Sequence, residues 1–232
     1  MKLLQRLRGA VAPARPPHPV EPLWLEWLAL GGMLLFGGWL LGVRGVWALL
    51  LSSDPTGLTL VIVLIFVAAT LWCGARSREL QRQRGLLRQA RSGQANAGWA
   101  FEYHHALRQH GRDFDAPLDM LMEWTHGPHH TAWWVNGIQL KLGLLGKVIG
   151  FSVLALQIGQ IQSFDASQSQ DLLKSLTAGL GIALLTTMVG LVGNILLGLQ
   201  LTRLDRYADK LVADCQRWGL DVHSGGHGDG PH

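Results

Sequence analysis

The chain has 232 residues, of which 48% are hydrophobic and only 16% are charged, and its formal net charge is +4. This charged fraction lies well below the roughly 25% of soluble domains. It argues against a soluble protein, because too little polar helix is left to cover the apolar segments. In a soluble protein the positive charge would suggest nucleic-acid binding. Here the positions of the basic residues favour membrane topology as the explanation.

Four segments carry most of the apolar residues: 23–43, 57–75, 137–161 and 172–201. Each has about the 20 residues that a helix needs to cross the hydrocarbon core of a bilayer. Pro22 precedes the first segment, where a proline suits the start of a helix, and Glu26 can reach lipid headgroups or a basic neighbour. The sequence predicts an all-α, polytopic membrane protein with four transmembrane helices and a small helical cap in the cytoplasm.

Lysine and arginine gather in three parts of the chain, and the two short connections 52–56 and 162–171 contain neither. The basic residues are Lys2, Arg6, Arg8 and Arg15, then Arg76, Arg78, Arg82, Arg84, Arg88 and Arg91, then Arg203, Arg206 and Lys210. The positive-inside rule places these three parts in the cytoplasm. We expect a cytoplasmic segment 1–22, transmembrane helices 1 and 2 in 23–75, a cytoplasmic helical loop 76–136, transmembrane helices 3 and 4 in 137–203, and a cytoplasmic tail 204–232 with a disordered end.

The loop 76–136 is expected to contain short helices, the last of which begins near Asp115 and stops at Gly127. These helices are too few for an independent enzyme domain. The chain also has neither a phosphate-binding glycine loop followed by Lys-Ser/Thr nor a GxSxG pattern. The sequence therefore predicts that the protein is not an enzyme.

The stretch "HGPHH" brings His126, His129 and His130 together in the sequence. Gly127 and Pro128 interrupt this cluster, and neither the HExxH nor the CxxC…H ligand spacing occurs. We interpret the histidines as solvent-facing loop residues, and we expect no metal site and no other cofactor.

Small and polar residues recur at helical spacing in the last two apolar segments. They are Gly143, Lys147, Gly150 and Gln157, within an arc of roughly 80°, and Ala183, Thr187, Gly190 and Asn194. Small residues let membrane helices approach closely, and polar ones hydrogen-bond across the contact. Packing alone can explain a threonine, since its hydroxyl can bond its own helix. Lys147 is a stronger functional candidate, because a lysine in the middle of a span costs about 2.5 to 3.5 kcal/mol.

The stretches "LGLLGKVIGF" and "LTAGLGIALLTTMVGLVGNILLGL" are similar to the last two spans of the MotA/TolQ/ExbB family of ion-driven motor subunits. That family shows a "GLxGTVxGI" helix and a "GIAxALxTTxxGL" helix. The matching residues are Gly143, Gly146, Gly150, Gly181, Ile182, Ala183, Thr186, Thr187, Gly190 and Leu191. The four-span layout, with a cytoplasmic loop between spans two and three, resembles MotA more than the three-span TolQ and ExbB, although this loop is short for a flagellar stator.

The resemblance implies a bacterial inner-membrane protein that couples ion flow, with protons as the expected ion, to mechanical work. It implies that five copies surround two copies of a single-span partner, whose membrane aspartate is protonated and released as ions pass. Thr187 and Thr186 would then line the ion path, with Asn194 and Lys147 beside them. The residues expected to pack the helices are Gly143, Gly146, Gly150, Gly181, Ala183 and Gly190.

Two positions depart from the family pattern. Lys147 stands where TolQ and ExbB carry a second channel threonine, and Ile182 replaces an ExbB-type glutamate. A ring of lysines repels cations unless burial neutralises them or the partner's aspartates pair with them. The alternative function is therefore a non-conducting membrane scaffold in which Lys147 anchors a salt bridge. A small secondary transporter has less support, because the four spans show no inverted repeat.

Overall fold

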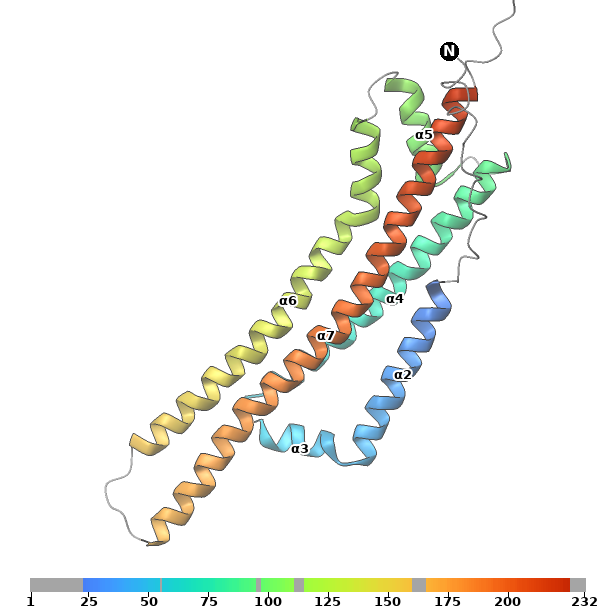
Figure 1. Cartoon of the computed structure of the whole chain (residues 1–232). Coiled ribbons are helices and arrows are strands. Elements are labelled where there is room, and N and C mark those ends of the chain that lie inside the picture. Colours follow the sequence, from blue (N-terminus) through green and yellow to red (C-terminus); the bar gives the residue numbers. More distant parts are fainter. Residues whose placement is uncertain (1–22, 55, 95–96, 111–114, 160–165, 226–232) are drawn as a thin grey trace, which may run out of the picture.

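The structure is a computed structural model, and it describes residues 23–54, 56–94, 97–110, 115–159 and 166–225. These residues are almost all helical, with no β-strand among them (Figure 1). The helices are α2 (Leu23–Val43), α3 (Val46–Ser53), α4 (Leu58–Arg91), α5 (Trp99–His110), α6 (Asp115–Gly159) and α7 (Ala166–Gly225). The predicted all-α class is confirmed.

Four helices, α2, α4, α6 and α7, are long and apolar enough to cross a membrane, which confirms the predicted number of spans. Helix α4 has 34 residues, α6 has 45 and α7 has 60, so all three exceed the about 20 residues that a span requires. At 1.5 Å per residue α7 is about 90 Å long. The cytoplasmic position of the cap and of both termini stays a prediction. The segments 1–22 and 226–232 lie outside the described residues.

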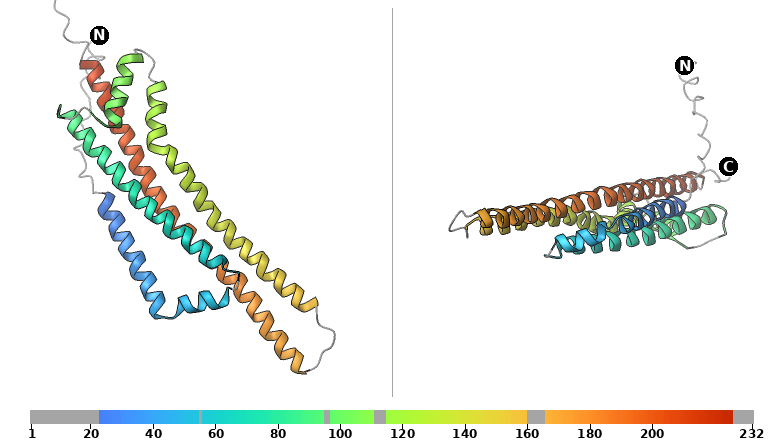
Figure 2. Two further views of the ribbon diagram at one scale, coloured as in Figure 1. Left: turned by 180° about the vertical axis from the view of Figure 1, so that it is seen from behind. Right: turned by 90° about the horizontal axis from the view of Figure 1, so that it is seen from below.

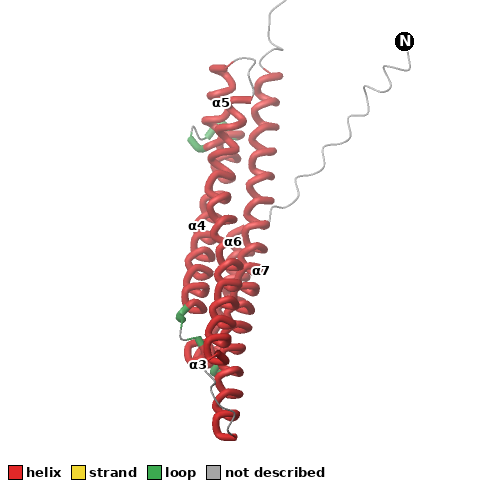
Figure 3. The backbone as a smooth tube through the Cα atoms, turned by 90° about the vertical axis from the view of Figure 1, so that its left-hand side faces the viewer, coloured by secondary structure: helices red, strands yellow, loops and turns green. Residues whose placement is uncertain are grey.

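The helices form an elongated, narrow bundle in which α6 and α7 run antiparallel, side by side (Figures 1, 2 and 3). Helix α7 also packs against α4, and α4 packs against α2. The end of α4, helix α5 and the end of α7 lie at one end of the bundle, which we call the α5 end, and the start of α2 points toward it (Figure 1). The opposite end, where α6 ends and α7 begins beyond α3, is the α3 end. The basic residues in the second half of α4 and the second half of α7 therefore share the α5 end.

Two contacts fix the outer helices. At the α5 end, Arg203 of α7 forms an ion pair with Glu26 of α2 over 2.9 Å, so Glu26 has the basic neighbour that its position suggested. At the α3 end, the chain turns at Gly45, which has a φ of 70° that suits glycine. Helix α3 then runs at an angle from the end of α2 toward α4 and α7 (Figure 1), and the Trp47 indole donates to the Gly38 carbonyl over 2.9 Å.

The expected helix stop at Gly127 is wrong. Helix α6 continues through Gly127 and Pro128 as one element of 45 residues. A proline inside a helix lacks the N–H that would bond the carbonyl four residues earlier, and its ring pushes that carbonyl away, so the helix bends. The first part of α6 is set at an angle to the remainder (Figure 1).

A long-range contact explains why the helix tolerates this proline. Pro128 leaves the carbonyl of Trp124 without its usual intrahelical donor and loosens the bond to the carbonyl of Thr125. Nη2 of Arg76, on α4, donates to both oxygens, over 2.6 Å to Trp124 and 2.9 Å to Thr125. Because Arg76 lies 48 residues or more from these partners in the sequence, local patterns at "HGPHH" could not reveal the compensation.

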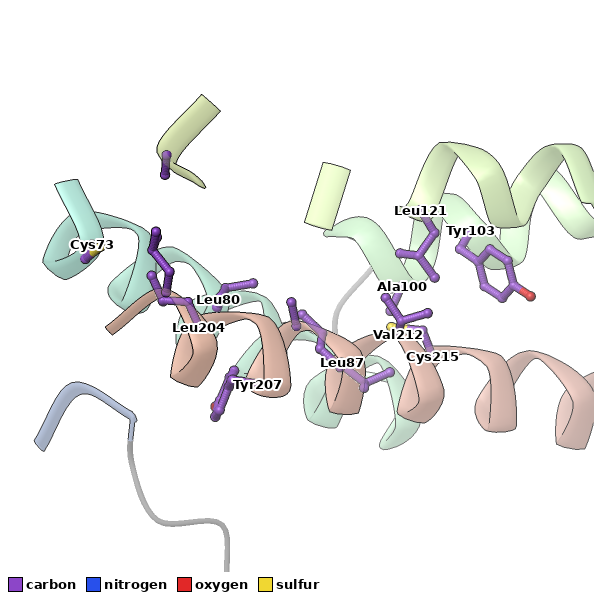
Figure 4. Packing of buried hydrophobic residues seen from close by; sticks show 14 of the residues in the cluster. Cys73, Leu80, Leu87, Ala100, Tyr103, Leu121, Leu204, Tyr207, Val212 and Cys215 are labelled. Atoms are coloured by element: carbon purple, nitrogen blue, oxygen red, sulfur yellow. The ribbon is translucent and has the colours of Figure 1, made fainter. Parts of the chain in front are cut away.

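The hydrophobic core lies mainly at the α5 end, where α4, α5, α6 and α7 meet (Figure 4). Leu121 of α6 packs there with Ala100 and Tyr103 of α5 and with Val212 and Cys215 of α7 (Figure 4). The two cysteines of the chain, Cys73 and Cys215, are both buried in this core and both free. The helical loop 76–136 is therefore part of the same bundle as the spans, since its helices share a core with α7.

Candidate functional site

The small residues of the two polar spans meet in a single contact, which we call the α6–α7 seam. It consists of Gly143, Gly146 and Gly150 on α6 and Ala183, Thr186, Thr187 and Gly190 on α7. All of these residues are buried except Thr187, which is half-buried. The 3,4 spacing of the glycines on α6 puts them on one face, and the same spacing on α7 supplies the opposing face. Gly181 lies outside the seam, on an exposed part of α7.

The backbones of α6 and α7 touch in the seam. A Cβ added to Gly190 would lie 2.9 Å from the carbonyl oxygen of Gln139 and 3.0 Å from Cα of Gly143. A Cβ added to Gly150 would lie 2.8 Å from Cβ of Ala183. These distances are shorter than van der Waals contact, so the approach of the two helices depends on the absence of side chains.

The two threonines occupy different positions in the seam. Thr186 is fully buried and fills the space over Gly146. The Thr187 hydroxyl donates within its own helix to the carbonyl of Ala183 over 2.8 Å and across the seam to the carbonyl of Gly143 over 3.1 Å. A hydroxyl has one proton to share between two such acceptors, and its own lone pairs remain available to accept.

Amide side chains continue the polar row beyond the threonines, toward the α5 end. Nδ2 of Asn194 donates to the carbonyl of Asn136 over 2.8 Å. Gln139 is fully buried, and neither its Nε2 nor its Oε1 has a hydrogen-bond partner in the described part of the chain. The spacing of Asn136, Gln139 and Gly143 places them on one helical face. Asn136 and Gln139 are not among the predicted site residues. The predicted third span begins at residue 137, which separates Asn136 from the polar face of α6.

Lys147 and Gln157 do not join the seam, although they share an arc of α6 with Gly143 and Gly150. Lys147 is exposed, and its Nζ lies 6.0 Å from the centre of the Phe151 ring. Gln157 is half-buried, with its Oε1 buried and unpaired among the described residues. An arc of roughly 80° is wide enough to reach from the buried line of a helix to its lateral surface. Among the predicted ion-path residues, the structure thus brings together Thr186 and Thr187 and leaves Lys147 on the surface beside them.

A second polar cluster, which we call the His129 cluster, lies nearer the α5 end. His129 is 2% exposed. Its Nδ1 lies 2.6 Å from Oδ1 of Asp205, and its Nε2 accepts from Nε of Arg76 over 3.4 Å. Trp133 donates from its indole to the other oxygen of Asp205 over 2.8 Å. The interpretation of His129 as a solvent-facing loop residue is therefore wrong, because α6 does not end before it and turns it toward α4 and α7.

His126, one turn earlier on α6, is also tied to α7, since its Nε2 lies 3.0 Å from Oδ1 of Asp209. His130 is exposed. Burial lowers the pKa of His129; the hydrogen bond and charge of Asp205 oppose this shift, and the charges of Arg76 and His126 add to it. A buried histidine with a lowered pKa is neutral near pH 7. No group of three or more histidine, cysteine, aspartate or glutamate side chains suited to a metal ion occurs in the described segments.

Comparison of the chain with protein-family models, with curated proteins and with solved structures found no match. The resemblance to the MotA/TolQ/ExbB family thus depends on the residues quoted from the two last spans. The geometry of those residues is an independent observation: two helices pack closely, a pair of hydroxyls lies between them, and a lysine lies on the adjoining surface.

Proposed function

We propose that this protein is a bacterial inner-membrane subunit of a rotary, ion-driven motor complex, and that the ion is the proton. In this proposal, five copies form a ring around two copies of a single-span protein that carries an aspartate in its membrane helix. Ion flow past the ring drives rotation that does work on another part of the cell envelope. Both termini lie in the cytoplasm, which agrees with the gathering of the basic residues of α4 and α7 at the α5 end.

The observation that carries the proposal is the position of Thr187. Its hydroxyl is held at the seam by the carbonyls of Ala183 and Gly143, and its side chain is still partly accessible from outside the chain. A hydroxyl in this position can accept a hydrogen bond from a protonated carboxyl and, by turning, donate one to a carboxylate. It does so without a fixed charge that would trap the ion.

Lys147 also favours a single-span partner that carries a membrane aspartate. Its ammonium lies on the surface of α6, one residue after Gly146 of the seam. An exposed cation in an apolar span is stabilised by an opposite charge, and the aspartate of a single-span partner supplies one. Pairing with that aspartate would also reduce the repulsion between lysines in a ring.

The apolar flanks of the helices provide the surface for neighbouring copies and for lipid. Leu145 and Val148 of α6 are 46% and 61% exposed, and Leu184 and Met188 of α7 are 57% and 53% exposed.

One observation favours the scaffold as the second candidate. Thr187 already donates to two carbonyls within the chain, so helix packing by itself accounts for its presence. In that case Lys147 would hold a partner in place without any ion passing.

Ion flux in liposomes separates the two candidates. Thr187→Val removes the hydroxyl, and we expect proton flux through the complex with its partner to fall by about tenfold, as expected for the loss of a hydrogen bond worth roughly 1.4 kcal/mol. Thr177→Val is the matched control, because Thr177 is exposed on the same helix and, within the described part of the chain, its hydroxyl bonds the carbonyl of Leu173 of its own helix, over 2.7 Å. Normal flux in the Thr187→Val complex would refute the channel role of this hydroxyl. A complete complex without flux would support the scaffold.

The partner is tested by purification from cells that also express the single-span proteins encoded nearby. We expect one of them to copurify through a span with an aspartate, and mass measurement of the complex to give more copies of this chain than of the partner. A monomer that binds no single-span protein would contradict both the motor and the ring.

A further inference from the structure

We propose that His129 is a proton-binding site, and that a proton bound there releases Arg76 from the carbonyls of Trp124 and Thr125 at the Pro128 bend of α6. The inference does not depend on the proposed motor function, because its test needs only the purified chain. It concerns the bend of α6 at the α5 end, which lies about 21 Å from Gly143 of the seam at 1.5 Å per residue.

The two hydrogen-bond partners of His129 fix its protonation state and tautomer. Asp205 accepts at its Oδ1, so the Nδ1 of His129 at 2.6 Å must carry a hydrogen. Arg76 is a donor only, so the Nε2 of His129 at 3.4 Å must be the acceptor for its Nε–H. The two contacts together require the neutral tautomer with its hydrogen on Nδ1.

A proton added to His129 binds at Nε2, the ring nitrogen that carries no hydrogen, and turns it from an acceptor into a donor. Two N–H groups and two positive charges then face each other across the Arg76–His129 contact, in a place where His129 is 2% exposed. Like charges at this separation repel strongly in a poorly hydrated site.

Of the two partners of His129, Arg76 and Asp205, Arg76 is the one that moves on protonation. Protonation strengthens the attraction between His129 and Asp205, because the pair then becomes an ion pair. Arg76 gains nothing and is repelled, so it is the group that leaves. The same guanidinium holds the carbonyls of Trp124 and Thr125, and its departure leaves the Trp124 carbonyl, which has no intrahelical donor because of Pro128, without a protein donor at the bend.

The groups that face His129 on every side agree with this direction. Helix α4 supplies Arg76 and the ring of Trp72, which meets the imidazole edge to face at 6.2 Å. Helix α7 supplies Asp205, the only carboxylate in direct contact with it among the described residues. From α6 itself, the His126 ring lies 5.8 Å away. The lowered pKa of His129 agrees with this balance, since burial, Arg76 and His126 together outweigh Asp205.

The pKa of His129 is lower in the closed bend, where Arg76 faces the ring, than in the open bend, from which Arg76 has moved away while Asp205 stays paired. Acidification below the pKa of the open form therefore favours the open bend, and the closed bend is most stable above it. Each pH unit between the two pKa values changes the population of the open form about tenfold.

The test is hydrogen–deuterium exchange of the amides of residues 129–132 in the purified protein, corrected for the intrinsic effect of pH on exchange. These amides lie directly after the proline and depend on the bend. In the native chain we expect exchange to be about tenfold or more faster at about pH 5 than at about pH 8. His130→Gln, which replaces the exposed neighbouring histidine, should keep this difference.

Two variants should abolish the difference between the two pH values. His129→Gln keeps an acceptor for Arg76 and cannot bind the proton. Pro128→Ala restores the N–H that bonds the carbonyl of Trp124, so that the helix no longer needs Arg76, while His129 itself remains. A native chain without pH-dependent exchange at these amides would overturn the proposal, and so would a pH response that persists in His129→Gln or in Pro128→Ala. None of these results bears on ion flux, so the proposed motor can fail or stand independently.

Discussion

The α5 end and the α6–α7 seam are built from the same two long helices, but the helices pack in opposite ways in the two regions. At the α5 end large side chains interlock, and Leu87, Leu121 and Leu211 are exposed by 2%, 0% and 2%. In the seam the backbones touch, and Thr186 is the largest fully buried side chain between them.

The difference follows from the solvent that each region suits. The α5 end carries the charged surface of the chain, and in water the burial of leucine is the main source of stability, at about 25 cal/mol per Å². In hydrocarbon a leucine gains little by moving from lipid to protein, so association depends on close contact and on hydrogen bonds between helices. Large residues therefore stabilise one end, and the lack of side chains stabilises the other.

The largest effect should come from the α5 end. Leu121→Ala leaves a cavity where α5, α6 and α7 meet, and we expect the free energy of unfolding to fall by about 2–5 kcal/mol. Unfolding by denaturant in detergent measures it. Leu220→Ala, at a position of α7 that is 57% exposed, should lower it by less than about 1 kcal/mol. Equal losses in the two variants would remove the contrast between the regions.

The seam should respond to the opposite kind of change. Gly190→Ala adds a methyl group 2.9 Å from the carbonyl oxygen of Gln139, and the helices must separate to accept it. We expect the free energy of unfolding to fall by about 1–3 kcal/mol. Gly181→Ala adds the same group where, apart from the adjacent residues and backbone of its own helix, no described atom lies within 4 Å, and should change the free energy of unfolding by no more than about 0.5 kcal/mol. If Gly190→Ala were as harmless as Gly181→Ala, the seam would not be held by backbone contact.

The hydrogen bonds between the helices should have the smallest effect. Asn194→Leu removes the donor to the Asn136 carbonyl, a bond of 2.8 Å. Bonds of this kind between membrane helices contribute on average about 0.6 kcal/mol, with about 1.7 kcal/mol as the upper end, and we expect a loss in that range by the same unfolding measurement. Ile195→Leu, at a neighbouring residue that is 58% exposed, should leave stability unchanged. A loss as large as that of Leu121→Ala would mean that polar contacts, rather than close approach, hold the seam.

Much of the arrangement could be predicted from local patterns. The four apolar helices follow from the length of the apolar segments, and the facing surfaces of α6 and α7 follow from the 3,4 spacing of Gly143, Gly146 and Gly150 opposite Ala183, Thr187 and Gly190. The same spacing predicted Thr187 of the seam, whereas Thr186 was implied only by the resemblance to the motor family. Periodicity identifies a helix face, but it does not define how far that face extends. It therefore could not show that Lys147 lies on the surface rather than in the seam.

The sequence by itself determined the number and type of the spans and the two helix faces that meet, because hydrophobic length and helical spacing are properties of contiguous residues. Only the tertiary structure decided that α6 runs through Pro128 and that His129 is buried. Those outcomes depend on the Arg76 guanidinium of α4 and the Asp205 carboxylate of α7. Both groups are distant in the sequence from the proline and the histidine that they satisfy, so no pattern around residue 128 contains them.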